Sequence, residues 1–477
     1  MNNIEAVNDV RVAKFGGTSL SDQGRIRHVG EIVSERATDD ANQLIVLSAA
    51  SGVTDLLLSG VRNAVDGEDP SVVIDNFVDI HQKLISEVAD PRDIDFLYDH
   101  VKDQERAISL HLSVIGDDRS DFAFHRDFII PQGELIMPFI FASHLRARGL
   151  DAVAIDPREL IVTNEQFGQA RLKKAKSQKS VEQEILPEFD DGRIVVTGGF
   201  TARSETGHTT TLDRGGSDLT ASFLARLIDE MPGFRVEDLT YGKQEASHIM
   251  SADPRVVFSP LSNSSMNYVE AIGAAGHGAK VMHPRAIQHA AIRGIPVDLR
   301  STGNISEAGT RIDAVGNPEQ AVKVIASRNG LVMVSVFGWS MDIPGITSRA
   351  SENFRKHGID IQSIIQTPSE QALRFTVGDT EDMEEIVERL RSSLKQEIQE
   401  GDVKEVGYLP TAVVGVIGAG VHCPEVQKKI QSGMDLDDRS ENHIELTSSP
   451  EHTIYVNPQH EDVPGIVRNL HKAIFEE

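Results

Sequence analysis

The sequence is poor in cysteine, aromatic residues and positive charge. It holds a single cysteine, Cys423, among 477 residues, and aromatic residues make up 5%. One cysteine excludes a disulfide within the chain and any metal cluster built from several thiolates. Lysine and arginine number 47 against 73 acidic residues, which gives a formal net charge of −26. That charge argues against nucleic acid or an anionic membrane as a general partner.

Long apolar runs are also missing. No run reaches the length of a membrane span, and residues 1–5 lack the basic and apolar parts of a secretory signal. We therefore expect a cytoplasmic protein. The acidic excess favours solubility, with adaptation to high salt as the alternative. Hydrophobic residues at 39% are ordinary for a globular chain, and the length predicts two or three domains.

The stretch VRVAKFGGTS at 10–19 has the pattern of a phosphate-binding turn. Its apolar residues predict a short strand that ends near Lys14, and the pair Gly16 and Gly17 and then Thr18 follow. Two glycines let backbone N–H groups approach an anion, and the helix expected next would add the positive end of its dipole. A structural turn is the alternative, because a P-loop has its lysine after the glycines.

Two polar residues, Ser48 and Glu134, lie at the end of a predicted strand and at the start of a predicted helix. Ser48 ends the apolar run 43–48, which has the length of a buried parallel strand. It is a candidate ligand contact at the carboxyl end of that strand, or a helix cap. Glu134 lies in the first turn of an apolar helix, where a carboxylate complements the helix dipole even without a substrate.

A second glycine pair, at 215–216, opens another predicted helix after a polar excursion at 201–212. Arg214 precedes the pair and can bind a carboxylate through two hydrogen bonds. Ser217 is placed to cap the helix or to contact a substrate, and Asp218 follows it. An ordinary helix start with an exposed arginine is the alternative.

The segments KFGGTS at 14–19, TTTLDRGGSD at 209–218 and GAKVMHP at 278–284 resemble, in this order, the signatures of aspartate kinases. These enzymes belong to the amino-acid kinase superfamily. The resemblance implies an α/β protein with a three-layer αβα fold and a mostly parallel central sheet over residues 1–315. It also implies phosphorylation of the L-aspartate side chain to 4-phospho-L-aspartate with ATP and Mg²⁺. This reaction is the first step of the aspartate-family amino-acid or ectoine pathway.

The resemblance assigns roles position by position. It implies that Lys14 and Asp218 are catalytic, with Asp218 orienting Lys14, and it implies no metal-ligating residue. The implied nucleotide contacts are Gly16, Gly17, Thr240, Arg255 and Lys280. The implied substrate contacts are Thr18, Ser48, Glu134, Arg214 and Ser217, with Glu134 receiving the ammonium group.

The sequence also departs from the family pattern. Met137 replaces a common serine, Asp213 replaces a common glycine, and the loop 241–255 is long and lacks an expected aspartate. This loop carries Lys243 and His248, which we expect to face solvent rather than a phosphate. Together with Asp213, it resembles the loop of aspartate kinases encoded with ectoine synthesis.

The C-terminal third has a shorter rhythm of strands and helices that recurs with a period of roughly 70 to 80 residues. It predicts two ferredoxin-like βαββαβ units, at 325–400 and 403–477, which resemble paired ACT domains. These imply a homodimer or higher homo-oligomer and an amino-acid effector, with dimerisation modules that bind nothing as the alternative. The rival functions are a kinase for another acid, such as glutamate, and a non-catalytic amino-acid sensor.

Overall fold

A computed structural model describes most of the chain. The described residues are 7–37, 41–118, 120–213, 215–244, 247–279, 282–303, 307–339, 345–366, 371–380, 382–434, 444–448, 450–459 and 462–476. The chain divides into two compact units. Unit 1 comprises Met1–Ile249, Asn263–Ile272 and Val281–Asn317, and unit 2 comprises Met250–Ser262, Gly273–Lys280 and Pro318–Glu477. The chain passes between them within β9 (Ile249–Met250), β10 (Ser262–Asn263) and α11 (Tyr268–Gly276), and after residues 280 and 317.

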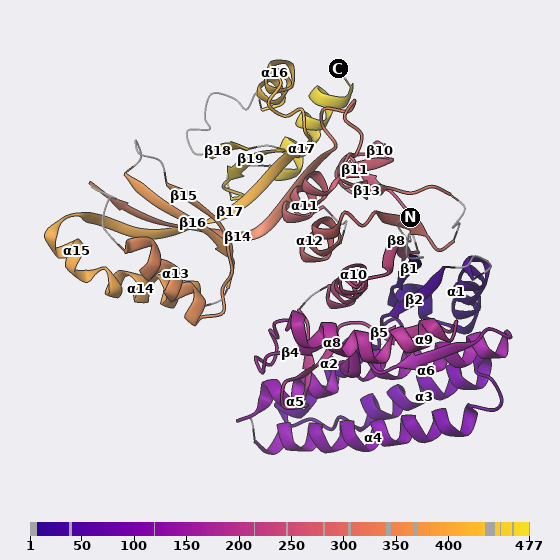
Figure 1. Cartoon of the computed structure of the whole chain (residues 1–477). Helices are drawn as coiled ribbons and strands as arrows, with labels where there is room; N and C mark the ends of the chain where they lie inside the picture. The colour runs from indigo at the N-terminus through magenta and orange to yellow at the C-terminus, as the bar shows by residue number, and fades with distance from the viewer. Residues whose placement is uncertain are drawn as a thin grey trace. The chain divides into compact units, whose positions relative to one another are not determined.

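Unit 1 is built on a sheet with the strand order β11-β13-β12-β8-β1-β2-β5-β3 (Figure 1). The bounds are β1 Asn8–Phe15, β2 Asn42–Leu47, β3 Ala152–Ile155, β5 Ile194–Gly198, β8 Phe234–Lys243, β11 Ser265–Asn267, β12 Val297–Ser301 and β13 Arg311–Asp313. β13 runs antiparallel to β12, and the other neighbours are parallel. Strands β2 and β5 are almost entirely buried because both faces of the sheet are covered.

Helices cover both faces of this sheet. On one side lie α1 Gln23–Arg36, α2 Val53–Asp66, α3 Ser71–Val88, α4 Ile94–Asp117 and α6 Gln132–Ala147, which share one apolar cluster. On the other side α10 (Gly216–Asp229) packs on β1, β2 and β8 and contacts α8 and α12. The remaining helices are α5 Phe122–Ile129, α7 Pro157–Leu160, α8 Lys174–Glu184, α9 Leu186–Asp190 and α12 Pro284–Arg293. The expected αβα layering is confirmed.

Alternation along β1 decides which side chains reach the α10 face. Ala13 and Phe15 belong to the apolar cluster that includes α1 and α6. Lys14 lies between them, so it points to the opposite face, where α10 packs. The packing of two apolar neighbours therefore directs the lysine toward α10.

The apolar segment Phe122–Ala147 is long and hydrophobic enough to cross a membrane by length and composition alone. It consists of α5 and α6, and 89% of its apolar window is buried inside the protein. This segment therefore forms part of the core of unit 1.

Residues 201–212 are more regular than a polar excursion. β6 (Thr201–Ser204) and β7 (Thr209–Thr211) pair as an antiparallel hairpin, and β4 (Val162–Thr163) lies parallel to β6. The threonines at 209–211 are buried, and β-branched residues favour a strand at such positions. The hairpin leads directly to the second glycine pair.

Unit 2 holds an antiparallel sheet with the order β15-β16-β14-β17-β19-β18. Its strands are β14 Val324–Gly338, β15 Ile361–Gln366, β16 Ala372–Gly378, β17 Val403–Ile417, β18 Ile444–Ser448 and β19 Glu451–Val456. Its helices are α13 Ile346–Lys356, α14 Met383–Ser393, α15 Lys395–Glu400, α16 Pro424–Gly433, α17 Val463–His471 and the terminal turn η2 Lys472–Glu476.

The two long strands β14 and β17 join the repeats of unit 2. They pair over nearly their whole length. Val334 of β14 and Val406 of β17 belong to one apolar core, whereas Ile325 and Val414 of the same strands belong to another. Each core is therefore completed by both strands, and the boundaries expected at 325–400 and 403–477 stay a prediction.

Candidate functional site

The site of unit 1 lies at the carboxyl ends of β1, β2, β5 and β8. β1 has β8 on one side and β2 on the other, so the strand order reverses at β1. In open α/β sheets a ligand binds in the crevice outside the carboxyl ends of the strands at such a switch point. The glycine pair after β1 and the turn after β5 both lie at this edge.

Lys14 and Asp218 form an ion pair at this edge. The Lys14 Nζ atom lies 2.7 Å from Asp218 Oδ1, and the two side chains are 14% and 17% exposed. Asp218 stands in the first turn of α10, and the Tyr241 hydroxyl donates a 2.9 Å hydrogen bond to its backbone oxygen. The structure thus brings together the end of β1, the start of α10 and the end of β8.

The glycines of the site have different reasons to be glycine. A Cβ atom on Gly17 would come within 2.8 Å of the Ala49 backbone oxygen, so packing after β2 requires a glycine there. A Cβ atom on Gly16 would meet nothing closer than Lys14 Nζ at 3.8 Å. Packing would therefore tolerate a side chain at position 16. With glycine there, the space in front of the backbone stays open.

The turn after β5 packs as tightly on the start of α10. A Cβ atom on Gly199 would lie 2.5 Å from the Cα atom of Ser217. The next residue, Phe200, has a φ of 66°. Among the described residues, it is the non-glycine residue with a positive φ. Such backbone conformations are strained and cluster at ligand sites. The second glycine pair is thereby held against the ends of the strands.

The helix expected after the first glycine pair is present as α1, but it does not begin directly at the pair. A short 3₁₀ turn, η1 (Gly17–Leu20), follows the first glycine pair, and α1 begins only at Gln23, where the Asp22 side chain caps it. The helix that starts directly after a glycine pair is α10, whose N-cap is Gly215 at a φ of 76°. No side chain caps this helix, so its N-terminal dipole is available at the site.

Two capping alternatives are also excluded. Ser217 does not cap α10, because its N-cap residue is Gly215 and no side-chain cap bond forms. Ser48 does not cap α2, whose N-cap is Gly52. The Ser48 N–H donates to the Phe15 backbone oxygen at 3.1 Å, which places Ser48 beside the end of β1.

Glu134 is a buried carboxylate with spare hydrogen-bonding capacity. It is 4% exposed, and its Oε1 accepts a 3.4 Å hydrogen bond from the Thr54 hydroxyl. Its Oε2 meets no hydrogen-bond donor among the described residues. Burial raises the pKa of Glu134 to about 7, while the Ala49 N–H, Thr54 and the charge of Lys14 act in the opposite direction. A buried acceptor of this kind suits a ligand cation.

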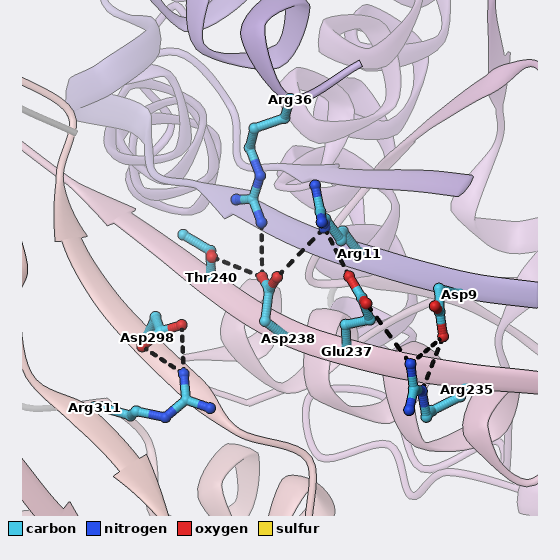
Figure 2. Close-up of polar contacts among 9 residues, drawn as sticks. All are labelled: Asp9, Arg11, Arg36, Arg235, Glu237, Asp238, Thr240, Asp298 and Arg311. Carbon is cyan, nitrogen blue, oxygen red and sulfur yellow. Dashed lines mark hydrogen bonds and ion pairs between the residues drawn. The ribbon is translucent and has the colours of Figure 1, made fainter. Parts of the chain in front are cut away.

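The structure places Thr240 away from this group. Thr240 pairs in register with Ala13, so it shares the α1 face of the sheet, opposite Lys14. Its hydroxyl donates a 2.9 Å hydrogen bond to Asp238 in a network of charged side chains (Figure 2). A cavity of about 230 Å³ opens there, lined in part by Arg36 and Asp298.

Three further predicted residues lie outside unit 1 or outside the described residues. Arg255 belongs to unit 2, where its exposed guanidinium binds the Asp253 carboxylate. Arg214 and Lys280 lie outside the described residues. Thr18, by contrast, is exposed beside the glycine pair, and its backbone oxygen accepts a 2.5 Å hydrogen bond from Arg25.

The expectation that Lys243 faces solvent was wrong. Lys243 is partly buried at the end of β8, on the same face as Tyr241. Burial and the charge of Lys14 lower the pKa of Lys243, and the charge of Asp218 raises it. Sequence reasoning favoured solvent over a phosphate contact for this residue, because the position of Lys243 depends on the register between β8 and β1.

His283 has a structural role at the start of α12. Its side chain accepts a 3.2 Å hydrogen bond from the Arg285 N–H and so caps α12. A Cβ atom on Gly215 would lie 2.7 Å from the Cβ atom of His283, so the cap packs against the second glycine pair. Within the described ranges, no group of three or more His, Cys, Asp or Glu side chains could hold a metal ion.

This fold and site define an α/β protein that presents cations and glycine turns to a ligand at one sheet edge. Residues 9–301 match the model of the amino acid kinase family, and residues 336–394 match that of the ACT domain. The first match covers more than half of the 477 residues. The chain therefore belongs to the amino acid kinase family.

Similar proteins extend the match over nearly the whole chain. Lysine-sensitive aspartokinase 3 of Escherichia coli is 27% identical over 488 residues, covering 98% of this chain and 100% of that protein. The aspartokinase of Bacillus sp. strain MGA3 is 26% identical, covering 97% and 96%. Bifunctional aspartokinase/homoserine dehydrogenase 1 of Arabidopsis thaliana is 27% identical over 85% of this chain, which spans only 44% of that relative.

A solved structure has the same fold. The crystal structure of E. coli aspartokinase III with aspartate and ADP superposes with a TM-score of 0.81 at 24% identity, covering 98% of this chain and 100% of that one. The structure of that enzyme with lysine and aspartate gives a TM-score of 0.70. The resemblance to aspartate kinases and the expected fold class are confirmed.

Proposed function

We propose that this protein is an aspartate kinase that transfers the γ-phosphoryl group of ATP to the side-chain carboxylate of L-aspartate. The observation that carries the proposal is the buried Glu134 carboxylate, whose Oε2 lacks a donor among the described residues. The positive charge of Lys14, at the end of β1, acts on this carboxylate. The ammonium group of a bound aspartate pairs with the Glu134 carboxylate. The side-chain carboxylate of the aspartate then faces Lys14.

The chemistry requires alignment and charge neutralisation. A carboxylate nucleophile is already ionised at neutral pH, so no general base is needed. Catalysis then depends on holding the two reactants in line and on stabilising negative charge. Lys14 stabilises the transferring phosphoryl group, and Asp218, 2.7 Å away, orients Lys14. Gly16 and Gly17 present backbone N–H groups to the phosphates.

The other proposed contacts follow their positions in the motifs. Arg214 binds a carboxylate of aspartate, and Lys280 binds phosphate of ATP. Thr18, Ser48 and Ser217 line the substrate side, while Arg255 contacts the nucleoside. Mg²⁺ arrives bound to the phosphates of ATP and neutralises part of their charge, which fits a site whose own donors are mainly cations and N–H groups.

A hydroxamate assay tests this function. The enzyme is incubated with Mg-ATP and either L-aspartate or L-glutamate, and hydroxylamine traps the acyl phosphate. We expect product with aspartate and at least about tenfold less with glutamate, because an extra methylene misplaces the carboxylate. Equal or greater turnover of glutamate would favour the rival kinase. No turnover and no calorimetric signal with Mg-ATP would favour an amino-acid sensor.

We further propose that unit 2 assembles the enzyme into a homodimer or higher homo-oligomer and regulates its activity. We also propose that the enzyme is cytoplasmic. The proposal is supported by the ACT match at residues 336–394 and by the joined sheet of β14 and β17. The assay is repeated with lysine, threonine and methionine, singly and together, and the mass in solution is measured by ultracentrifugation. A monomer whose turnover none of the three amino acids changes would contradict this regulation.

A further inference from the structure

The lysine at the end of β8 points into the site. Lys14 of β1 pairs in register with Tyr241 of β8, so these two side chains share one face of the sheet. The Tyr241 hydroxyl reaches the Asp218 backbone oxygen at 2.9 Å, which identifies this face as the α10 face. Lys243 follows two residues later on the same face, at the carboxyl edge where ligands bind.

The backbone beside Lys243 is tied to its surroundings. The Lys243 carbonyl accepts a 2.8 Å hydrogen bond from the Thr302 N–H. The next side chain, Gln244, accepts a 2.6 Å hydrogen bond from the Arg25 guanidinium. The same guanidinium donates to the Thr18 backbone oxygen at 2.5 Å. Arg25 therefore links the residue after Lys243 to the turn that contains the first glycine pair.

The charges around Lys243 favour an incoming anion. Its ammonium group is near enough to Lys14 and Asp218 for both charges to act on its pKa. The carboxylate of Asp218 already pairs with Lys14 at 2.7 Å. Two ammonium groups on one face of the sheet therefore lie within electrostatic range of one carboxylate in a partly buried place, and these three residues together carry a net positive charge. A phosphate group would neutralise that charge.

We propose that Lys243 is a further phosphate-binding lysine, which contacts the β-phosphate of the nucleotide beside the phosphoryl group held by Lys14. This inference rests on the proposed kinase function and names a further residue of the same site. In the transfer, a carboxylate oxygen of aspartate bonds to the γ-phosphorus as the bond to the β-phosphate oxygen breaks. The electron pair stays on that oxygen of ADP, and a fixed ammonium stabilises it while keeping its own proton.

Calorimetry on the full chain tests the assignment without turnover. Mg-ADP and AMP are titrated into the wild type, Lys243→Gln, Lys243→Arg and the control Lys102→Gln. Lys102 is an exposed lysine that pairs only locally with Asp99, at 3.1 Å. We expect Lys243→Gln to weaken Mg-ADP binding at least about tenfold, because a charged hydrogen bond is lost. AMP, which lacks the β-phosphate, should lose less than about threefold in affinity.

The remaining variants separate the explanations. Lys243→Arg keeps the charge and should retain more Mg-ADP affinity than Lys243→Gln, and Lys102→Gln should bind like the wild type. Equal Mg-ADP affinity in Lys243→Gln and the wild type overturns the role of Lys243 but leaves the proposed kinase intact. A wild type that binds no Mg-ADP overturns the kinase itself. If Lys243→Gln fails to fold, Lys243→Arg decides, since equal weakening of ADP and AMP in it contradicts a β-phosphate contact.

Discussion

The ammonium of Lys14 at the end of β1 lies 2.7 Å from the carboxylate of Asp218 in the first turn of α10. The two residues come from distant segments, and their pairing joins the two glycine turns into one site. Both side chains are less than a fifth exposed, so each is held in place by its surroundings as well as by the other. A lysine held in this way can stabilise charge without first reorganising.

Replacing Lys14 should therefore remove turnover while leaving the fold. We expect Lys14→Met to lower kcat at least about a hundredfold, because the charge that faces the transferring phosphoryl group is lost. Asp218 then lacks its partner, so a modest fall in thermal stability is also expected. The coupled release of ADP measures turnover, and circular dichroism measures folding. Lys102→Met serves as the control, and wild-type turnover in a folded Lys14→Met would contradict the assignment.

Substitutions in the first glycine pair can separate effects on packing from effects on nucleotide binding. A Cβ atom on Gly17 would collide with the Ala49 backbone oxygen at 2.8 Å, whereas Gly16 has room for one. Gly16 also has an extended backbone, with φ at −82°, that alanine adopts freely. We expect Gly16→Ala to melt like the wild type but to bind Mg-ADP at least about tenfold more weakly, since a methyl group then blocks the phosphate.

Gly17→Ala is the matched comparison. It should lower the melting temperature as well as the nucleotide affinity, because the backbone after β2 must move. Gly378→Ala, at a glycine with nothing within 4 Å of the added Cβ atom, should change neither property. Unaltered Mg-ADP affinity in Gly16→Ala would show that the phosphates do not approach this turn.

Much of the site follows from local sequence. The strand–Gly-Gly pattern around Lys14 and the glycine pair before Asp218 are short-range signals, since glycine and a terminal strand residue have fixed uses there. The αβα fold was expected from the resemblance to aspartate kinases that these motifs carry, and the structure confirms it. Helix α10 begins at the second glycine pair, as the motif predicts.

What sequence reasoning missed depends on pairing between distant strands. The register of β8 against β1 puts Lys243 on the face of Lys14 and Thr240 on the other face, and no local pattern encodes that register. The joining of the two repeats through β14 and β17 has the same cause. The start of α1 at Gln23, after the 3₁₀ turn η1, is set by the Asp22 cap, a single side chain in a polar stretch.

The raised pKa of Glu134 predicts proton release when aspartate binds. Burial raises the pKa of Glu134 to about 7, so at pH 6 the carboxyl group of the free protein is mostly protonated. An ammonium group beside it favours the ionised form. We expect close to one proton to be released per bound aspartate at pH 6 and almost none at pH 8.5. Calorimetry in two buffers of different ionisation enthalpy measures this number.

The same group affects stability in the absence of substrate. The folded-state pKa is about 7 against 4.5 in the reference state, so the folded protein holds this proton more tightly. The resulting stabilisation is fully present below pH 4.5 and is lost as pH rises through 7, by about 3 kcal/mol. Glu134→Gln should remove both effects and weaken aspartate binding. Proton release that persists in Glu134→Gln would assign it to another group.

A buried aspartate positions the strand that leads to the second glycine pair. Asp127 of α5 is fully buried, and it accepts hydrogen bonds from the Thr211 hydroxyl at 2.8 Å, the Thr211 N–H at 3.1 Å and the Gly168 N–H at 2.8 Å. Asn at this position offers one acceptor oxygen in place of two. We expect Asp127→Asn to destabilise the protein by about 2 kcal/mol, because a buried donor is left unpaired.

The loosened strand should affect the two substrates differently. β7 ends at Thr211, shortly before the second glycine pair. We expect aspartate binding to weaken severalfold, because a displaced contact costs alignment. Mg-ADP affinity should stay within about twofold of the wild type. Asp121→Asn is the control, because Asp121 is exposed and its side chain makes no cap bond to α5. Chemical denaturation gives the stability, and steady-state kinetics give the KM for aspartate. An equal loss of aspartate and ADP affinity in Asp127→Asn would mean that the variant disturbs the whole of unit 1, and would contradict a role confined to the aspartate side.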